Sequence, residues 1–358
     1  MLFNLFVEWL KANGTQEDHI IGLQLDDFRH RKLREPETLL DYIDSLLPQD
    51  GKVTYIILDE IQLVEHFVEV MLSLMHLPNV EVYVSRSNSR FLSSDVVTEF
   101  RGRGQEIRVR PLSVMEYVEG TGKDFNTALR EYFVYGGLPQ VALLSSNEEK
   151  ENFLREMYEV TYLRDVVERN GLRNAEGLRE LVRVLASGIG SSSNAKRIAD
   201  TFRSVEGTKL TYSAVKGYIT HLQNSFLIEE ALRYDVKGRK YIGTESKYYF
   251  ADPGLRNVVL NFRQIEETHI MENVIYNELR SRGALVDVGL VETWTRDSSG
   301  KTQRCNLEVD FVCNRGSERV YLQSAYALPS QEKVEQEERS LKSISDSFHK
   351  IVVVMDDI

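Results

Sequence analysis

Three short apolar runs alternate with helical patterns in the first quarter of the chain, and this alternation limits the fold more than any other feature. The runs are Ile20–Leu25, Thr54–Leu58 and Val80–Ser85, with helical stretches around residues 37–47 and 62–75 between them. Nearly continuous apolar strands are typical of parallel sheets that are buried on both faces, with helices as the crossover connections. The sequence therefore predicts an α/β layer, preceded by an amphipathic helix over residues 1–12.

The rest of the chain shows two further patterns. Residues 113–163 read as helical with a break at Gly136–Pro139, and residues 106–110 are expected to add one strand before Pro111. Three helices and two extended runs then follow the winged-helix order, at residues 176–188, 194–202, 211–224, 226–234 and 247–251. The last part combines a helix over 271–282 with β-like runs at 307–313, 320–326 and 349–355 and a helix over 331–344. We expect three domains, at residues 1–112, 113–262 and 263–358.

Composition narrows the class of protein. The 358 residues carry 44 Lys and Arg against 55 Asp and Glu, a net charge of −11, which argues against a surface coated for nucleic acid but allows one basic face. Two cysteines are too few for a disulfide framework and lack the spacing of a zinc site. No apolar run reaches the roughly 18 residues of a membrane span. We expect a soluble cytoplasmic protein.

The run Tyr55–Leu58 ends in two acids, Asp59 and Glu60. This is the form of a Walker B motif, in which the first acid holds Mg²⁺ through water and the second polarises the attacking water. The alternative interpretation is a buried strand that ends in solvated carboxylates.

Polar residues also follow the next run. Arg86 and Asn88 stand at the carboxyl end of the predicted third strand, where ligands bind in open α/β sheets, and Asn88 is a candidate sensor that orients water. Arg103 lies in a glycine-spaced loop and is a candidate arginine finger. A plain turn and a surface arginine are the alternatives.

The order of these motifs resembles a family of prokaryotic AAA-type ATP-binding proteins that have a C-terminal domain of unknown function. The segments that carry the resemblance are Leu25–Asp27, Ile57–Gln62, Ser87–Ser89, Phe100–Gly104, Pro111–Tyr117, Tyr135–Pro139, Tyr162–Val166, Glu272–Asn273 and Glu308–Phe311. The resemblance implies a P-loop ATPase core, a helical and winged-helix middle and a nuclease-like α/β end. It also implies ATP and Mg²⁺ as cofactors, with Asp59 for Mg²⁺, Glu60 and Asn88 for water, and Arg103 as finger.

One departure from the family bears on mechanism, because no G-x-x-x-x-G-K-[ST] occurs in the sequence. The family's core would then lack its first strand and P-loop, as if roughly 30 to 50 residues before Met1 were missing. Either the start is an internal Met or the natural protein has lost the loop. Without the backbone cradle and its Lys, we expect very weak ATP binding and no hydrolysis. Arg86, where relatives have Gly, either replaces lost positive charge or blocks the site.

The predicted middle domain offers basic residues for DNA. In a winged helix, the recognition helix enters the major groove and the wing contacts phosphate. The candidates are Arg197, Lys216, Arg239 and Lys240. A protein-contact or lid module is the alternative.

The predicted C-terminal domain resembles a PD-(D/E)XK nuclease core with an incomplete site. Glu272 and Asp310 match acids of the pattern, whereas the third acid is Gln323 and the lysine position is Ala325. We expect an inactive nuclease fold in which Asp310 is the remaining acid.

These inferences favour an AAA-type ATP-binding protein whose nucleotide site is impaired in this chain. The alternative function is a non-enzymatic DNA-binding or protein-interaction module that uses the winged helix and the degenerate nuclease fold. An arginine finger that acts on a neighbouring copy would require a homo-oligomer.

Overall fold

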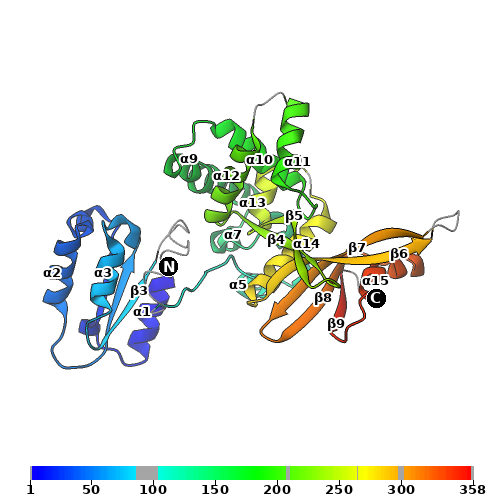
Figure 1. Ribbon diagram of the computed structural model, residues 1–358. Helices are drawn as coiled ribbons and strands as arrows, with labels where there is room; N and C mark the ends of the chain where they lie inside the picture. Colours follow the sequence, from blue (N-terminus) through cyan, green and yellow to red (C-terminus); the bar gives the residue numbers. More distant parts are fainter. Residues whose placement is uncertain (1, 86–103, 207–209, 264, 297–301, 356–358) are drawn as a thin grey trace. The chain divides into compact units, whose positions relative to one another are not determined.

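The computed structural model describes residues 2–85, 104–206, 210–263, 265–296 and 302–355. The chain divides into two compact units, Met1–Ile107 and Arg108–Ile358 (Figure 1). The first unit contains a parallel sheet in the order β1-β2-β3. Its elements are α1 (Leu2–Ala12), η1 (Glu17–His19), β1 (Ile20–Gln24), η2 (Phe28–Arg34), α2 (Pro36–Leu46), β2 (Thr54–Asp59), η3 (Ile61–Leu63), α3 (Phe67–Leu74) and β3 (Val80–Val84).

Helices cover both faces of this sheet. Ile56 and Leu58 of β2 lie in one apolar core with Leu39 of α2 and Val70 of α3. On the other face, the Phe6 ring of α1 lies 4.6 Å from the Tyr83 ring and 6.4 Å from the Tyr55 ring, centre to centre. The continuous apolar run of β2 thus packs on both sides, which confirms the α/β layer and the three predicted strands.

The second unit begins with helices. They are α5 (Val114–Thr121), α6 (Phe125–Tyr135), α7 (Pro139–Leu143), α8 (Asn147–Glu156), the π-helical η5 (Met157–Arg164), α9 (Asp165–Arg169), α10 (Ala175–Ser187), α11 (Ala195–Thr201), the π-helical η6 (Phe202–Glu206) and α12 (Tyr212–Asn224). The helical stretch from Ser113, its break after Tyr135 and the three helices that follow are confirmed.

The expected strand at residues 106–110 is wrong. This segment belongs to no strand, and Arg108 and Arg110 pair with the buried carboxylate of Glu229, each 2.7 Å from its Oε1. Ion pairs with Glu229, and not the hydrogen bonds of a strand ladder, therefore fix this segment.

A six-stranded sheet follows, in the order β5-β4-β6-β7-β8-β9. Its elements and flanking helices are β4 (Ile228–Asp235), β5 (Lys240–Phe250), α13 (Pro253–Val259), α14 (Glu267–Ser281), β6 (Leu285–Arg296), β7 (Thr302–Arg315), β8 (Glu318–Ala325), α15 (Gln331–Lys342) and β9 (His349–Val354). The expected hairpin is β4–β5, and β4 also pairs in parallel with β6 over Arg233–Asp235. The hairpin is therefore an edge of the sheet that contains the C-terminal strands, and β6 is an addition to the prediction.

A buried carboxylate joins the helical break at Gly136–Pro139 to α13. Asp252 accepts hydrogen bonds from the backbone N–H of Gly137 at 2.7 Å and of Leu255 at 3.0 Å. Gly136 has φ +75°, and a Cβ there would lie 2.0 Å from Asp252 Oδ1, so only glycine fits. Burial raises the pKa of Asp252 to about 6, although the backbone hydrogen bonds act in the opposite direction.

We expect Asp252→Asn to destabilise the second unit by about 1–3 kcal/mol, because an amide offers one acceptor to two buried N–H groups. The raised pKa means that the stability contributed by Asp252 is complete below its unfolded pKa and is lost as pH rises through about 6. The amide of the variant does not titrate, so the penalty should be larger at pH 4 than at pH 7. Urea unfolding at both pH values measures the difference.

Asp124→Asn is the matched control. Asp124 is the exposed N-cap of α6. Hydrogen bonds from the hydroxyl and the backbone N–H of Thr127 lower its pKa. Its contribution is therefore lost as pH falls, and its penalty should have the opposite pH trend. A penalty for Asp252→Asn that grows from pH 4 to pH 7 would contradict the assigned role of burial.

Candidate functional site

The carboxyl edge of the first unit's sheet gathers the predicted Walker B acids. The parallel register sets Asp59 beside Gln24 of β1, and the next residue after β3, Ser85, donates its N–H to Leu58 O at 3.0 Å. Asp59 ends β2, and Glu60 follows it in the left-handed region at φ 57°. The chain turns sharply here, so two consecutive acids leave the sheet at the same edge.

Ser85 connects the two acids to β3. Its hydroxyl donates to Asp59 Oδ1 and accepts the backbone N–H of Glu60 at 3.1 Å. The side-chain amide of Gln62 also donates to Glu60 Oε2. The acids are therefore held by neutral donors at the edge where ligands bind in parallel sheets.

The other residues predicted for this edge lie outside the described part of the chain. They are Arg86, Asn88 and Arg103. Their predicted roles stay predictions.

A second polar cluster lies in the second unit, where β7 and β8 separate. The two strands pair only over Phe311–Arg315 and Glu318–Leu322. Just beyond this ladder, Asp310 Oδ2 accepts the backbone N–H of Ser324 at 2.8 Å. The Asp310 side chain therefore fills the fork between the strands. We name this cluster the fork site and define it by Lys247, Glu272, Glu308 and Asp310.

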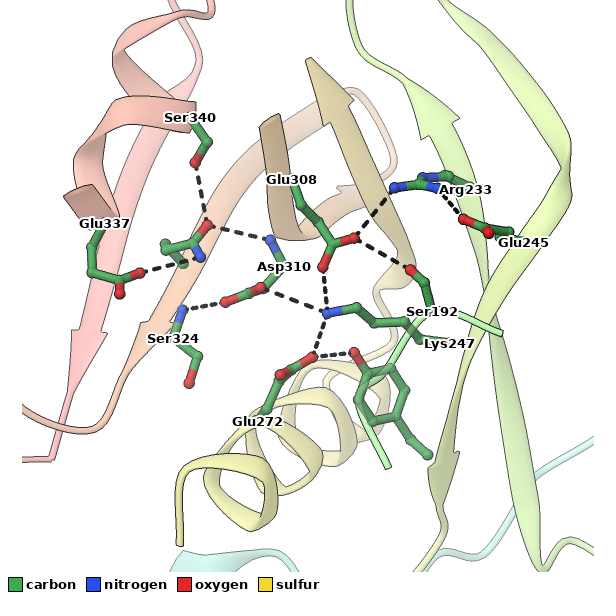
Figure 2. A network of polar contacts seen from close by, with 12 residues as sticks. Ser192, Arg233, Glu245, Lys247, Glu272, Glu308, Asp310, Ser324, Glu337 and Ser340 are labelled. Atoms are coloured by element: carbon green, nitrogen blue, oxygen red, sulfur yellow. Dashed lines mark hydrogen bonds and ion pairs between the residues drawn. The ribbon is translucent and has the colours of Figure 1, made fainter. Parts of the chain in front are cut away.

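One lysine stands among the three acids of the fork site (Figure 2). The Lys247 Nζ lies 2.8 Å from Glu308, 2.9 Å from Glu272 and 3.7 Å from Asp310. Its side chain is only 4% exposed. Burial acts to lower the pKa of Lys247, but the surrounding carboxylates raise it above its ordinary value, so the ammonium stays charged.

Further partners complete the cluster. The Tyr249 hydroxyl donates to Glu272 Oε1 at 2.6 Å, and Ser192 donates to Glu308 Oε2 at 3.3 Å. Arg233 lies 2.5 Å from Glu245 and 3.5 Å from Glu308. Burial first, and then the charge of Glu272, raise the pKa of Asp310. These residues come from β4, β5, α14, β7 and the segment between α10 and α11 (Figure 2).

The Glu272–Asn273 motif joins α14 to β5. Glu272 binds Lys247 and Tyr249, whereas Asn273 accepts the N–H of Phe250 at 2.8 Å and donates to its carbonyl oxygen at 2.8 Å. Two adjacent helical residues thus bind three residues of one strand. The motif holds the hairpin against the helix.

Gln323 contacts the backbone of Asp310 and two residues of α15. Its Oε1 accepts the N–H of Asp310 at 3.4 Å and the hydroxyl of Ser340 at 3.3 Å, and its amide donates to Glu337 at 3.4 Å. The side chain thus connects β7 to α15. These partners are distinct from the carboxylates around Lys247.

The basic residues proposed for DNA come from two regions. Arg197 and Lys216 are exposed on α11 and α12, and Arg239 and Lys240 are exposed where the β4–β5 hairpin turns. The hairpin turn also contacts the sheet, since Lys237 Nζ donates to the carbonyl oxygen of Glu292 at 2.6 Å.

Sequence reasoning identified Glu272 and Asp310 but missed Lys247 and Glu308 as members of one site. A signal for Lys247 was present, because it begins the strongly apolar run Lys247–Phe250. A lysine in a strand of this kind needs a buried counter-charge.

None of the helices in the described ranges has both the length and the apolar character that a membrane crossing needs.

We expect Lys247→Met to destabilise the second unit by about 3–5 kcal/mol, because it leaves buried carboxylates without their cation. Adding Glu272→Gln should recover part of this loss, since one of the unpaired charges is then removed. Urea unfolding followed by circular dichroism measures both variants. Lys342→Met is the control, because Lys342 is 67% exposed and forms a surface ion pair with Glu338. Equal effects of the two lysine substitutions would contradict a structural role for the fork site.

Comparison with known proteins adds two domain matches. Residues 1–118 match the family model described as AAA domain, and residues 126–266 match the one described as Domain of unknown function (DUF8612). The parallel sheet with Asp59 and Glu60 lies within the first match. The resemblance to AAA-type proteins is thus confirmed for the N-terminal part.

Two uncharacterized proteins are similar over most of the chain. One, from Haemophilus influenzae, is 27% identical over 99% of this chain and 85% of its own length. The other, from Methanocaldococcus jannaschii, is 26% identical over 80% of this chain, and the match spans 64% of that relative's length. The chain therefore begins with a segment similar to AAA domains and shares most of its length with bacterial and archaeal relatives.

Proposed function

We propose that the first unit is the nucleotide-binding part of an AAA-type ATPase, with Asp59 as the residue that holds Mg²⁺ and Glu60 as the one that polarises water. The observation that carries the proposal is the pair of acids at the carboxyl edge of a parallel sheet, held by Ser85. Carboxylate oxygen is a ligand type that Mg²⁺ prefers, so the residues at this edge fit the metal. The match of residues 1–118 to AAA domains supports the same assignment.

ATP and Mg²⁺ are the cofactors that this proposal requires. When bound together, the metal neutralises phosphate charge during transfer to water. Arg86, Asn88 and Arg103 are proposed to act around the phosphates, with Asn88 as sensor and Arg103 as finger. A finger that acts on a neighbouring copy makes a homo-oligomer part of the proposal, and light scattering with and without nucleotide tests it.

We further propose that nucleotide binding is impaired in the 358-residue chain. Its sequence contains no G-x-x-x-x-G-K-[ST]. That loop supplies a cradle of backbone N–H groups, a lysine for the β- and γ-phosphates and a hydroxyl ligand for Mg²⁺. Asp59 and Glu60 contribute to the metal and the water but do not replace those phosphate contacts.

Titration calorimetry with Mg·ATP should therefore give an affinity weaker than about 100 μM and no phosphate release. Any residual binding that depends on Mg²⁺ should be lost in Asp59→Asn and kept in Glu60→Gln, because only Asp59 is assigned to the metal. Micromolar affinity of the 358-residue chain would contradict the impairment. Residual binding that Asp59→Asn leaves unchanged would contradict the assignment of the site.

A non-enzymatic DNA-binding or protein-interaction module is the second candidate. Its support is the exposure of Arg197, Lys216, Arg239 and Lys240. Fluorescence anisotropy with duplex DNA should then show binding that weakens steeply with salt and that falls in Lys216→Ala. Salt-insensitive anisotropy would eliminate the DNA form of this candidate.

Two smaller proposals complete this function. The C-terminal part is proposed to be a PD-(D/E)XK-like fold without nuclease activity, supported by Gln323 and Ala325 at the positions of the third acid and the lysine. A cytoplasmic location is supported by Cys305 and Cys313, which are free thiols.

A further inference from the structure

The PD-(D/E)XK-like fold proposed above implies a divalent metal ion at Glu272 and Asp310. The distances within the fork site show whether these residues fit such an ion. Mg²⁺ requires oxygen ligands at about 2.0–2.1 Å in octahedral geometry. Here Glu272 and Glu308 lie 2.9 and 2.8 Å from the Lys247 nitrogen, which are the distances of charge-assisted hydrogen bonds to an ammonium. The carboxylates are arranged around a nitrogen, so the residues do not fit the metal.

The charges at the fork site make a cation necessary. Lys247 and Arg233 face the four carboxylates of Glu245, Glu272, Glu308 and Asp310. Buried carboxylates are destabilising unless they are paired and hydrogen-bonded. Among the described residues, only Lys247 contacts the three acids of the fork site together, so its ammonium is the charge that allows them to lie close to one another.

The elements around β5 hold the Lys247 ammonium within the fork site. Lys247 stands on β5, which is bound to α14 through the two hydrogen bonds between Asn273 and Phe250. The half of the hairpin that carries Lys247 lies beyond the Arg233–Asp235 ladder with β6. Its place is therefore set by the pairing of Lys247 with Ala231 of β4, by α14 and by the acids themselves.

We propose that Lys247 is the resident cation of the fork site and takes the place that a divalent metal ion would occupy. The acids of the fork site bind the chain's own ammonium, which joins β5, α14 and β7. This inference is independent of the proposed nucleotide site. It predicts that the wild-type fork site excludes divalent cations and that removing the ammonium opens a site for one.

Mn²⁺ binding followed by electron paramagnetic resonance tests this, with every variant made in an Asp59→Asn background so that the first unit does not contribute. The parent chain, which keeps Lys247, should bind no Mn²⁺ at the fork site. Its Mn²⁺ binding should therefore be the same with and without Asp310→Asn. Lys247→Ala should bind one Mn²⁺ about tenfold or more tightly than the parent, because Glu272 and Asp310 then lose their cation and Glu308 keeps only Arg233. Lys247→Gln, whose side chain is one bond shorter than that of lysine and adds an oxygen ligand, should do the same. Mn²⁺ should raise the Tm of both variants.

Lys342→Ala is the matched control, since it removes an exposed lysine that is ion-paired with Glu338, and it should gain no Mn²⁺ site. Asp310→Asn added to Lys247→Ala should abolish the new site. The proposal is overturned if the chain with Lys247 already binds an Mn²⁺ that Asp310→Asn removes. It is also overturned if Lys247→Ala and Lys247→Gln gain no Mn²⁺, whether they are folded or remain unfolded with millimolar Mn²⁺.

Discussion

The buried ammonium of Lys247 is the interaction on which the arrangement of the second unit most depends. Three acids from α14 and β7 surround it. Tyr249 donates to the same Glu272 oxygen as Lys247, and Ser192 donates to the second oxygen of Glu308. Desolvating these charges is costly, and their mutual attraction offsets that cost only when the geometry is good and each remaining oxygen has a donor. Around the cluster, Lys247, Tyr249, Ser192 and the backbone N–H of Ser324 are donors to these carboxylates. The ion cluster specifies which strand, helix and segment come together rather than adding a large net stability.

A second buried acid, Asp252, joins the helices of the second unit to its sheet. Asp252 directly follows Ala251 after β5 and accepts the N–H groups of Gly137 and Leu255. Gly136 and Gly254 allow this approach, because a Cβ at either position would lie about 2 Å from a neighbouring atom. Asn273 holds Phe250 between these two charges. Residues 247–252 thus form one continuous stretch that contacts the fork site, α14 and the break after α6.

The fold could be predicted where the pattern is local, and the fork site could not because its contacts are distant. The strands β1, β2 and β3 were evident because a parallel strand buried on both faces is apolar at nearly every position. The strand β6 was missed because Asp287 and Gly289 interrupt the apolar run, and the register with β7 shifts between them. Lys247 pairs with acids that are distant in sequence, from Glu272 on α14 to Asp310 on β7. No spacing rule connects such positions, although a lysine in an aromatic strand requires a counter-charge somewhere.

Carboxylates collect at the carboxyl edge of the sheet in the first unit and at the fork between β7 and β8 in the second, and the donor that faces them decides what each site can bind. At the edge of the first unit, Asp59 accepts a hydrogen bond from the Ser85 hydroxyl and Glu60 accepts one from the Gln62 amide. These neutral donors orient the acids without neutralising them. At the fork site, Glu272, Glu308 and Asp310 receive an ammonium that already supplies the positive charge. A metal ion is attracted by uncompensated negative charge and must replace whatever donors the oxygens already have. A hydroxyl is readily displaced from a carboxylate by a divalent ion, whereas a buried ammonium on a fixed strand is not. The Mg²⁺ site proposed for the first unit and the resident-cation site proposed for the second therefore use the same residue types and differ in the donors that face them.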